Sequence, residues 1–181
     1  NIDFLAGSGH KLCGPTGIGF LWSREKILNE IPPFLGGGEM IEDVFEEKST
    51  WAELPHKFEA GTPAIAEAIG LAEALKYIKK IGLNNINNYE KKITQYLFNH
   101  LSNIENLHII GPSPTNDQNR ASLAAFYVDN IHSNDIAEIL DSKGVCIRSG
   151  HHCCQPLHRH LGIKSTARVS MNFTTTKEDI D

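Results

Sequence analysis

The amino-acid sequence predicts an α/β fold, and two patterns along the chain support this prediction. Apolar runs of strand length alternate with stretches in which apolar residues recur every three or four positions, and Gly-rich or Pro-rich segments separate them. Strands and helices in alternation are typical of α/β domains. The 181 residues are 40% hydrophobic and 22% charged, a composition that excludes collagen, coiled-coil and largely disordered proteins.

The first 60 residues are expected to form strands and turns. Strands are predicted over 2–6 and 18–22, and the turn between them, 7–11, opens a glycine-rich stretch that does not suit a helix. Residues 39–60 alternate charged and bulky side chains without a helical period, so a hairpin is expected there.

Two helices are expected next, one on each side of Gly82. The first begins near Pro63, and its apolar face is formed by Ile65, Ala68, Ile69, Ala72, Leu75 and Ile78. The second repeats this spacing with Ile86, Tyr89, Ile93, Tyr96, Leu97 and Leu101. Gly82 ends the first helix, and we expect it to separate two domains, 1–81 and 82–181.

The remainder of the chain is expected to add strands over 107–110, 122–128, 145–148 and 167–173. A polar loop, 113–120, precedes the second of these strands. A helix begins near Asn134, is capped by Ser133 and stops at Gly144. The strand before it and the strand after it complete a unit of βαβ size.

Both ends of the sequence are informative. Thr175 and Glu178 have the spacing of a helix capping box, and the helix that they announce is cut off after Asp181. The chain starts with Asn1 inside a predicted strand, and no secretory leader is visible. We therefore expect an internal fragment of a longer protein.

Net charge, hydropathy and cysteine content exclude further classes of protein. Seventeen basic residues against 22 acidic ones give a net charge of −5, and no basic run is interleaved with aromatic residues, so a nucleic-acid surface is not expected. No apolar stretch approaches the roughly 20 residues that span a bilayer. The four cysteines (Cys13, Cys146, Cys153 and Cys154) do not resemble a secreted disulfide framework, so we expect reduced thiols in a reducing compartment.

The first candidate site is the turn that carries Ser8, His10 and Lys11. A hydroxyl, an imidazole and free backbone amides beside a lysine form a place where a phosphate can sit and an amine can reach an aldehyde. The alternative is that Lys11 is simply a solvated surface residue.

The second candidate is the segment from Arg148 to Pro156. Arg148, His151 and His152 are expected to supply positive charge that favours a reactive thiolate at Cys153. The alternative is a structural zinc site that draws on His151, His152, Cys153, Cys154, His158 or His160, although adjacent ligands rarely converge on one tetrahedral ion.

Two weaker candidates remain. Gly61 and Thr62 precede a predicted helix whose free amides favour an anion, and the alternative is that Thr62 is an N-cap before Pro63 at the first helical position. Arg168 lies in an otherwise apolar strand, where a substrate carboxylate and a protein salt bridge are equally good partners.

Together these segments resemble the C-terminal part of type II, SufS-like cysteine desulfurases, which are class V aminotransferase-family enzymes that use pyridoxal 5'-phosphate. The similar stretches are SGHKLCGPTGIGFLW (8–22), GGGEMI (36–41), FEAGTP (58–63), GLNNINNYE (82–90), RSGHHCCQP (148–156) and ARVSMNFT (167–174). Each motif is weak, but the set in this order is highly specific. The resemblance implies the end of the large domain of a fold type I enzyme in 1–81 and its small domain in 82–181.

The resemblance also implies roles for individual residues. Lys11 matches the lysine that holds pyridoxal phosphate and moves the substrate's Cα proton, and Ser8 and His10 match phosphate contacts. Gly61 and Thr62 match phosphate contacts that come from the neighbouring subunit of a homodimer. Cys153 matches the cysteine that attacks the substrate sulfur, Arg168 matches the arginine that binds the substrate carboxylate, and Arg148 lies beside the sulfur-transfer loop.

The implied activity is removal of sulfur from L-cysteine, which gives L-alanine and a persulfide that an acceptor of SufE or SufU type collects for iron–sulfur cluster assembly. Selenocysteine lyase and cysteine-sulfinate desulfinase are the alternatives on the same fold, and a zinc-stabilised binding module is a remote one. The expected location is the cytoplasm, or the plastid stroma in a eukaryote.

Two departures from the family pattern matter. The motif more often carries a small residue at the position of Cys154, so Cys154 is hypothesised to intercept the persulfide. Family residues that stack on the cofactor ring, pair with its nitrogen and complete the phosphate cup lie upstream of Asn1, so the fragment alone is expected to be inactive.

Overall fold

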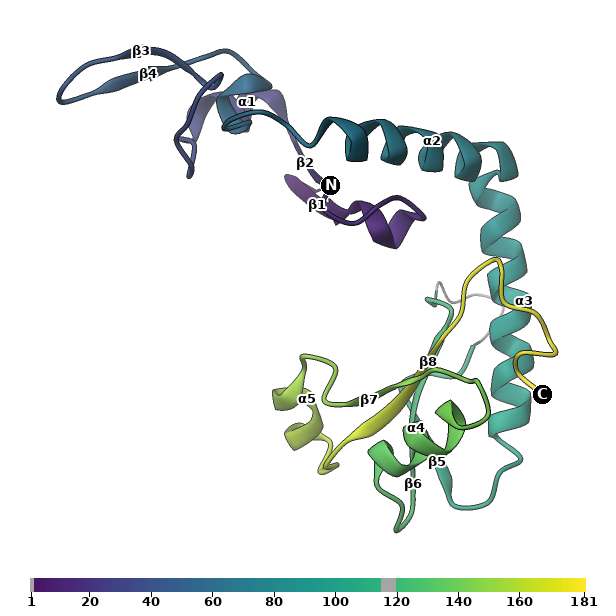
Figure 1. Ribbon diagram of the computed structural model, residues 1–181. Coiled ribbons are helices and arrows are strands. Elements are labelled where there is room, and N and C mark those ends of the chain that lie inside the picture. Colours follow the sequence, from purple (N-terminus) through teal and green to yellow (C-terminus); the bar gives the residue numbers. More distant parts are fainter. Residues whose placement is uncertain (1, 115–119) are drawn as a thin grey trace. The chain divides into compact units, whose positions relative to one another are not determined.

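The computed structural model describes residues 2–114 and 120–181, and it confirms the α/β prediction (Figure 1). The chain divides into two compact units, Asn1–Ile81 (unit 1) and Gly82–Asp181 (unit 2). The division falls at Gly82, between the two predicted helices. Most of the predicted polar loop 113–120 lies outside the described residues.

Unit 1 opens with an antiparallel strand pair joined by a tight turn. Strands β1 (Phe4–Ser8) and β2 (Gly19–Ser23) pair so that Ser8 lies opposite Gly19. A 3₁₀ turn, Gly9–Leu12, follows β1 directly. Both strands begin later than predicted, but the predicted order of strand, Gly-rich turn and strand is confirmed.

The rest of the first 60 residues forms a short helix and the expected hairpin. Helix α1 (Glu25–Glu30) was not predicted; strands β3 (Ile41–Val44) and β4 (Ser49–Trp51) are antiparallel and form the hairpin. Nζ of Lys57 donates hydrogen bonds of 3.0 Å to the carbonyls of Leu28 and Asn29 near the end of α1. This cation therefore satisfies carbonyls that a helix end leaves open.

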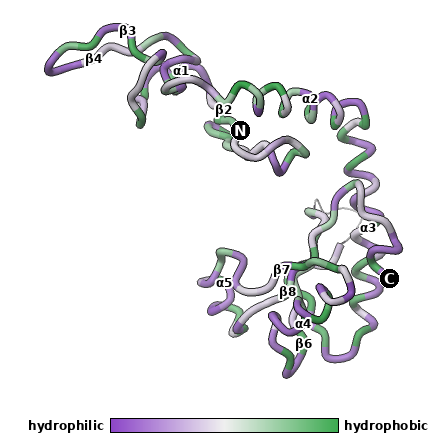
Figure 2. Tube along the Cα trace, in the orientation of Figure 1, coloured by the Kyte–Doolittle hydropathy of each residue, from purple (hydrophilic) through white to green (hydrophobic). Residues whose placement is uncertain are grey.

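Helix α2 (Ile65–Ile81) confirms the first predicted helix, but most of its apolar face is exposed. Ile65 and Ile69 are 59% and 62% exposed, whereas Leu71, outside the predicted face, is 8% exposed. Leu71 is buried because it packs on Gly14, where an added methyl group would lie 2.8 Å from the Leu71 side chain. Figure 2 shows that the apolar residues of α2 are concentrated in its first half.

Unit 2 is a four-stranded sheet with helices. Its elements are α3 (Leu83–Leu101), β5 (Leu107–Ile110), β6 (Leu123–Val128), α4 (Ser133–Asp141), β7 (Arg148–Gly150), α5 (Gln155–His160) and β8 (Thr166–Ser170). The strand order is β5-β6-β8-β7, and each neighbouring pair is antiparallel. Strands β6 and β7 therefore run parallel to each other with β8 inserted between them, so the predicted βαβ unit is a split one.

The hydrophobic core of the described chain lies in unit 2. Buried residues of α3, β6 and β8 form it, together with one residue that follows β8: Ile93, Leu97, Phe98, Leu101, Ala124, Phe126, Ala167 and Met171. Burying one large side chain of this kind contributes roughly 1.5–3 kcal/mol. The predicted face of the second helix is thus confirmed at Ile93, Leu97 and Leu101, while Tyr89 remains 39% exposed.

Three predicted boundaries in unit 2 are wrong. The strand predicted over 145–148 is β7 (Arg148–Gly150), because Val145 N bonds back to Leu140 O at 3.0 Å and this contact still belongs to the helix exit. The last strand ends at Ser170 and not at position 173. The cap of α4 is His132, whose Nδ1 accepts from Asn134 N at 3.2 Å, while the Ser133 hydroxyl donates to Ser165.

The predicted capping box at Thr175 and Glu178 is displaced by one residue. Thr176 N donates to Asp179 Oδ2 at 2.8 Å, and Asp179 N donates to Thr176 Oγ1 at 3.3 Å, which is the reciprocal pattern of such a box. The Thr175 hydroxyl instead accepts from Asn172 N at 3.1 Å. Competition from Asn172 therefore shifts the motif.

A helix that crosses a membrane must be both long and strongly apolar. Over the described ranges, no helix combines these two properties.

Candidate functional site

The turn that carries Ser8, His10 and Lys11 is stabilised by a hydrogen bond of its buried glycine, Gly9. Gly9 is buried and its amide donates to Ile18 O at 2.8 Å, and an added methyl group at Gly9 would lie 2.8 Å from the Ile18 side chain. Ser8 ends β1 half-buried, whereas His10 and Lys11 lie exposed on the 3₁₀ turn. The backbone thus fits tightly around a glycine that has no room for a side chain, and it presents the lysine to the outside.

Gly61 and Thr62 lie in a second loop of unit 1. Gly61 has φ +80°, a left-handed conformation that favours glycine, and its amide donates to Gly38 O at 2.8 Å. Ala68 N bonds to Ala64 O at 2.9 Å, so the first helical bond of α2 starts at Ala64. The alternative in which Thr62 caps the helix is therefore wrong, and Thr62 is exposed.

The cysteine loop in unit 2 follows β7 and has an unusual backbone. Gly150, His152 and Cys153 have φ values of 110°, 52° and 62°, so two consecutive non-glycine residues are left-handed. Such conformations cost of order 1–3 kcal/mol each, and they collect at functional sites. The turn is closed by Cys154 N, which donates to His151 O at 2.9 Å.

The loop places an exposed thiol beside a guanidinium group. Arg148 Nη2 donates to Cys153 Sγ at 3.4 Å. The prediction that Arg148 supplies positive charge to Cys153 is therefore supported by direct contact. His152 differs from the prediction, because burial and the charge of Arg168 lower its pKa below the ordinary value of 6.5, while the hydrogen bond with the Thr166 backbone raises it. His152 is thus held neutral.

Arg148 and Arg168 lie directly opposite each other in the β7–β8 ladder. Like charges in directly opposed positions of a sheet repel, and an anion between them relieves the repulsion. The Nε of Arg168 donates to Ser170 Oγ at 3.1 Å, and neither arginine forms an ion pair with a carboxylate in the described ranges. The salt-bridge alternative for Arg168 is therefore not realised, and the pair has the chemistry of a carboxylate site.

The sequence did not reveal one residue of this site. Thr166 is 1% exposed and its hydroxyl lies 3.0 Å from His152 Nε2 and 3.1 Å from His158 Nε2. The sequence suggests His158 only as a ligand of the alternative zinc site. A threonine at the start of a strand is ordinary, so no signal in the sequence singles it out.

The zinc alternative receives no support from the geometry. Among the residues that the structure describes, no group of three His, Cys, Asp or Glu side chains is placed to hold a metal ion. All four cysteines are free thiols, as predicted. Cys154 is half-buried, and its thiol donates to His151 O at 2.9 Å.

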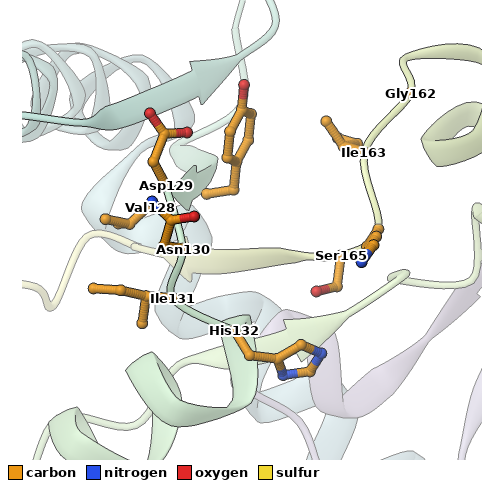
Figure 3. Close-up of a pocket in the computed structure, with 10 residues that line it drawn as sticks. Val128, Asp129, Asn130, Ile131, His132, Gly162, Ile163 and Ser165 are labelled. Atoms are coloured by element: carbon orange, nitrogen blue, oxygen red, sulfur yellow. The ribbon is translucent and has the colours of Figure 1, made fainter.

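A pocket of about 420 Å³ lies elsewhere in unit 2 (Figure 3). The turn after β6 and the loop before β8 line it, with His132 and Ser165 among the labelled side chains. None of the predicted site residues lines this pocket.

The chain is similar to curated proteins over its whole length. A probable cysteine desulfurase of Synechocystis is 54% identical over 181 residues, which are 100% of this chain and 43% of that protein. One from Streptomyces coelicolor is 46% identical over 179 residues, or 99% of this chain and 42% of that protein. The chain therefore spans less than half the length of these relatives.

Solved structures show the same relationship. The crystal structure of the cysteine desulfurase CsdA from Escherichia coli matches with a TM-score of 0.90 and 35% identity, over 99% of this chain and 44% of that one. The apo cysteine desulfurase of Thermococcus onnurineus matches with a TM-score of 0.91 and 41% identity, over 98% and 44%. The model of the class-V aminotransferase family matches residues 1–181. The chain, with its lysine turn and its cysteine loop, therefore belongs to the class-V aminotransferase family.

Proposed function

We propose that the protein to which this chain belongs is a cysteine desulfurase that uses pyridoxal phosphate. The observation that carries the proposal is the exposed Cys153 thiol in the loop after β7, 3.4 Å from Arg148 Nη2. Arg168, on the neighbouring strand β8, lies opposite Arg148. A nucleophilic sulfur beside an unpaired cationic pair suits a substrate that presents both a sulfur and a carboxylate. L-cysteine is such a substrate.

The lysine turn fits the cofactor that this family uses. The amide of Gly9 is already bonded to Ile18 O, so the Ser8 hydroxyl is the group that this closed turn offers to a phosphate, and the exposed Lys11 amine can bind an aldehyde. His10, Gly61 and Thr62 complete the proposed set. When bound, pyridoxal phosphate supplies an electron sink for the substrate's Cα. Lys11 moves the proton at that carbon.

Three residues of the chain then bind the substrate and take up its sulfur. Arg168 binds and orients the substrate carboxylate through its planar guanidinium group. Arg148 holds Cys153 Sγ in place through the 3.4 Å contact. The Cys153 thiolate attacks the substrate sulfur, so a new S–S bond forms on the protein while the Cβ–S bond of the substrate breaks. L-alanine leaves, and a persulfide remains on Cys153.

Assembly, partner and location complete the proposal. Residues 1–81 are assigned to the end of the large cofactor-binding domain and 82–181 to the small domain. Contacts of Gly61 and Thr62 with a second copy's phosphate would make the enzyme a homodimer. An acceptor of SufE or SufU type would collect the sulfur for iron–sulfur cluster assembly. The four free thiols support a reducing compartment, the cytoplasm or the plastid stroma.

The test uses the full-length protein loaded with pyridoxal phosphate and given L-cysteine. Intact-protein and peptide mass spectrometry should show a reducible gain of one sulfur atom at Cys153 together with release of L-alanine. Both signals should disappear in Lys11→Ala, and the sulfur should disappear in Cys153→Ala. Faster turnover of selenocysteine or cysteine sulfinate than of cysteine would show that L-cysteine is not the preferred substrate. No alanine from any of the three would overturn the proposal.

A further inference from the structure

Thr166 connects two histidines, His152 and His158, that lie on either side of Cys153 and Cys154 in the sequence. Its hydroxyl lies 3.0 Å from His152 Nε2 and 3.1 Å from His158 Nε2, and His152 Nε2 is also 3.1 Å from the Thr166 carbonyl. Thr166 is 1% exposed, opposes Gly150 in the β7–β8 ladder and is therefore fixed by the sheet. A side chain anchored in the sheet thus contacts a ring on each side of the thiols.

The acceptors in this cluster determine where the protons lie. The Thr166 carbonyl accepts only, so His152 Nε2 carries a proton, and the lowered pKa of His152 leaves its Nδ1 bare. Nδ1 of His152 is buried without a partner in the described part of the chain, which is less costly for a bare acceptor than for an N–H group. The Thr166 hydroxyl then accepts from His152 and has its own proton to donate to His158 Nε2.

The tautomer of His158 follows from its hydrogen-bond partners in the same way. His158 is 5% exposed and its Nδ1 lies 3.2 Å from the Cys154 carbonyl, which again only accepts. With Nε2 accepting from Thr166, Nδ1 is the N–H group of His158 and donates to that carbonyl. Two carbonyls, together with the hydroxyl between the rings, therefore assign opposite tautomers to the two histidines, Nε2–H in His152 and Nδ1–H in His158.

These bonds hold a loop whose backbone is not relaxed. His152 and Cys153 are left-handed at φ 52° and 62°, a region that L-residues occupy only when the surroundings impose it. The anchored His152 ring fixes the first of these residues, and the His158 contact fixes the Cys154 carbonyl on the other side of Cys153. The exposed thiol is thereby held where Arg148 reaches it.

We propose that Thr166 is a positioning residue for sulfur transfer: its hydroxyl, shared by His152 and His158, holds the left-handed loop that presents Cys153. The link to sulfur transfer rests on the function proposed above. The geometric part stands without it, because it concerns tautomers and thiol presentation in the resting protein.

The test compares Thr166→Val, which keeps the shape and loses the hydroxyl, with Thr166→Ser, which keeps the hydroxyl. The matched control is Ser133→Ala, which removes a 2% exposed hydroxyl that bonds Ser165 and contacts neither histidine. In the full-length protein, mass spectrometry follows the rate of Cys153 alkylation by iodoacetamide from pH 6 to 9. The ¹⁵N shifts of labelled histidines report the tautomers, and neither readout requires turnover.

Thr166→Val should lower the alkylation rate and the single-turnover rate of persulfide formation about tenfold, the effect of one buried hydrogen bond. It should also weaken the Nδ1–H preference of His158, which then rests on the Cys154 carbonyl alone, whereas Thr166→Ser and Ser133→Ala should stay within about twofold of the parent. Unchanged alkylation in Thr166→Val would overturn the proposal. So would wild-type spectra with the proton on His152 Nδ1, a result that does not depend on whether any variant folds.

Discussion

Residues 82–181 should fold alone, and residues 1–81 should not. The buried core cluster lies wholly in unit 2, whereas the buried hydrophobic residues of unit 1 are Met40 and Leu71. Unit 1 also exposes apolar residues of β1, β2 and α2, including Trp22 at 48% and Ile69 at 62%. A separate chain of residues 82–181 should therefore show one cooperative transition in urea, and a chain of residues 1–81 should show none.

Leu97→Ala sharpens this prediction. Leu97 is 4% exposed within the core, so its truncation should cost about 2–5 kcal/mol out of the roughly 5–15 kcal/mol typical of a whole domain. At about 4–8 °C per kcal/mol for a domain of this size, Tm should fall by at least about 8 °C. Ile139→Ala, at a 60% exposed position on α4, is the matched control and should stay within about 0.5 kcal/mol. Equal losses in the two variants, or no cooperative transition in 82–181, would refute the reasoning.

Three further predictions concern the site. Arg168→Lys should raise the KM for L-cysteine about 10- to 100-fold with a smaller change in kcat, because a planar fork is replaced by a point charge; steady-state kinetics of the full-length enzyme will show it. His152 has a folded-state pKa below its ordinary value of 6.5, so the unfolded chain binds more protons as the pH falls through 6.5. The stability of 82–181 should therefore decrease on acidification through that range in urea titrations, and His152→Gln should flatten the slope. Interception of the persulfide by Cys154 remains a hypothesis: it requires that Cys154→Ala raise the yield of sulfur reaching an acceptor, and unchanged transfer would retire it.

Local sequence signals predicted the elements of this chain better than their packing. The 3.6-residue period located α2 and α3, and Leu107–Ile110 was predicted to the residue. The same period assigned α2 an apolar face that is mostly exposed, because periodicity identifies a stripe but not what covers it. The prediction that Ser133 caps α4 is wrong for a related reason. Its hydroxyl has a tertiary partner, Ser165, which the sequence around the helix does not show.

The candidate site likewise contains residues that local motifs indicate and residues that only the folded structure brings together. Lys11, Cys153 and Arg148 stand in short motifs whose chemistry is local, so the sequence alone makes them candidates. The opposition of Arg148 and Arg168 depends on the register of β7 and β8, and the role of Thr166 depends on two rings brought to it from another segment. Long-range pairing of this kind leaves no periodic trace in the sequence, and only the folded sheet shows it.

The charges around Cys153 follow one physical rule. The positive charge in contact with Cys153 comes from Arg148, and Arg168 lies opposite Arg148; both guanidinium groups stay charged at any pH at which a protein folds. Burial and the charge of Arg168 lower the pKa of the neighbouring His152. A cationic His152 would add charge near the same thiol, but that charge would disappear within the neutral pH range. In its neutral form His152 has one N–H group, at Nε2, and this group donates to Thr166. The histidine therefore contributes geometry, and Arg148 contributes a charge at the thiol that does not titrate.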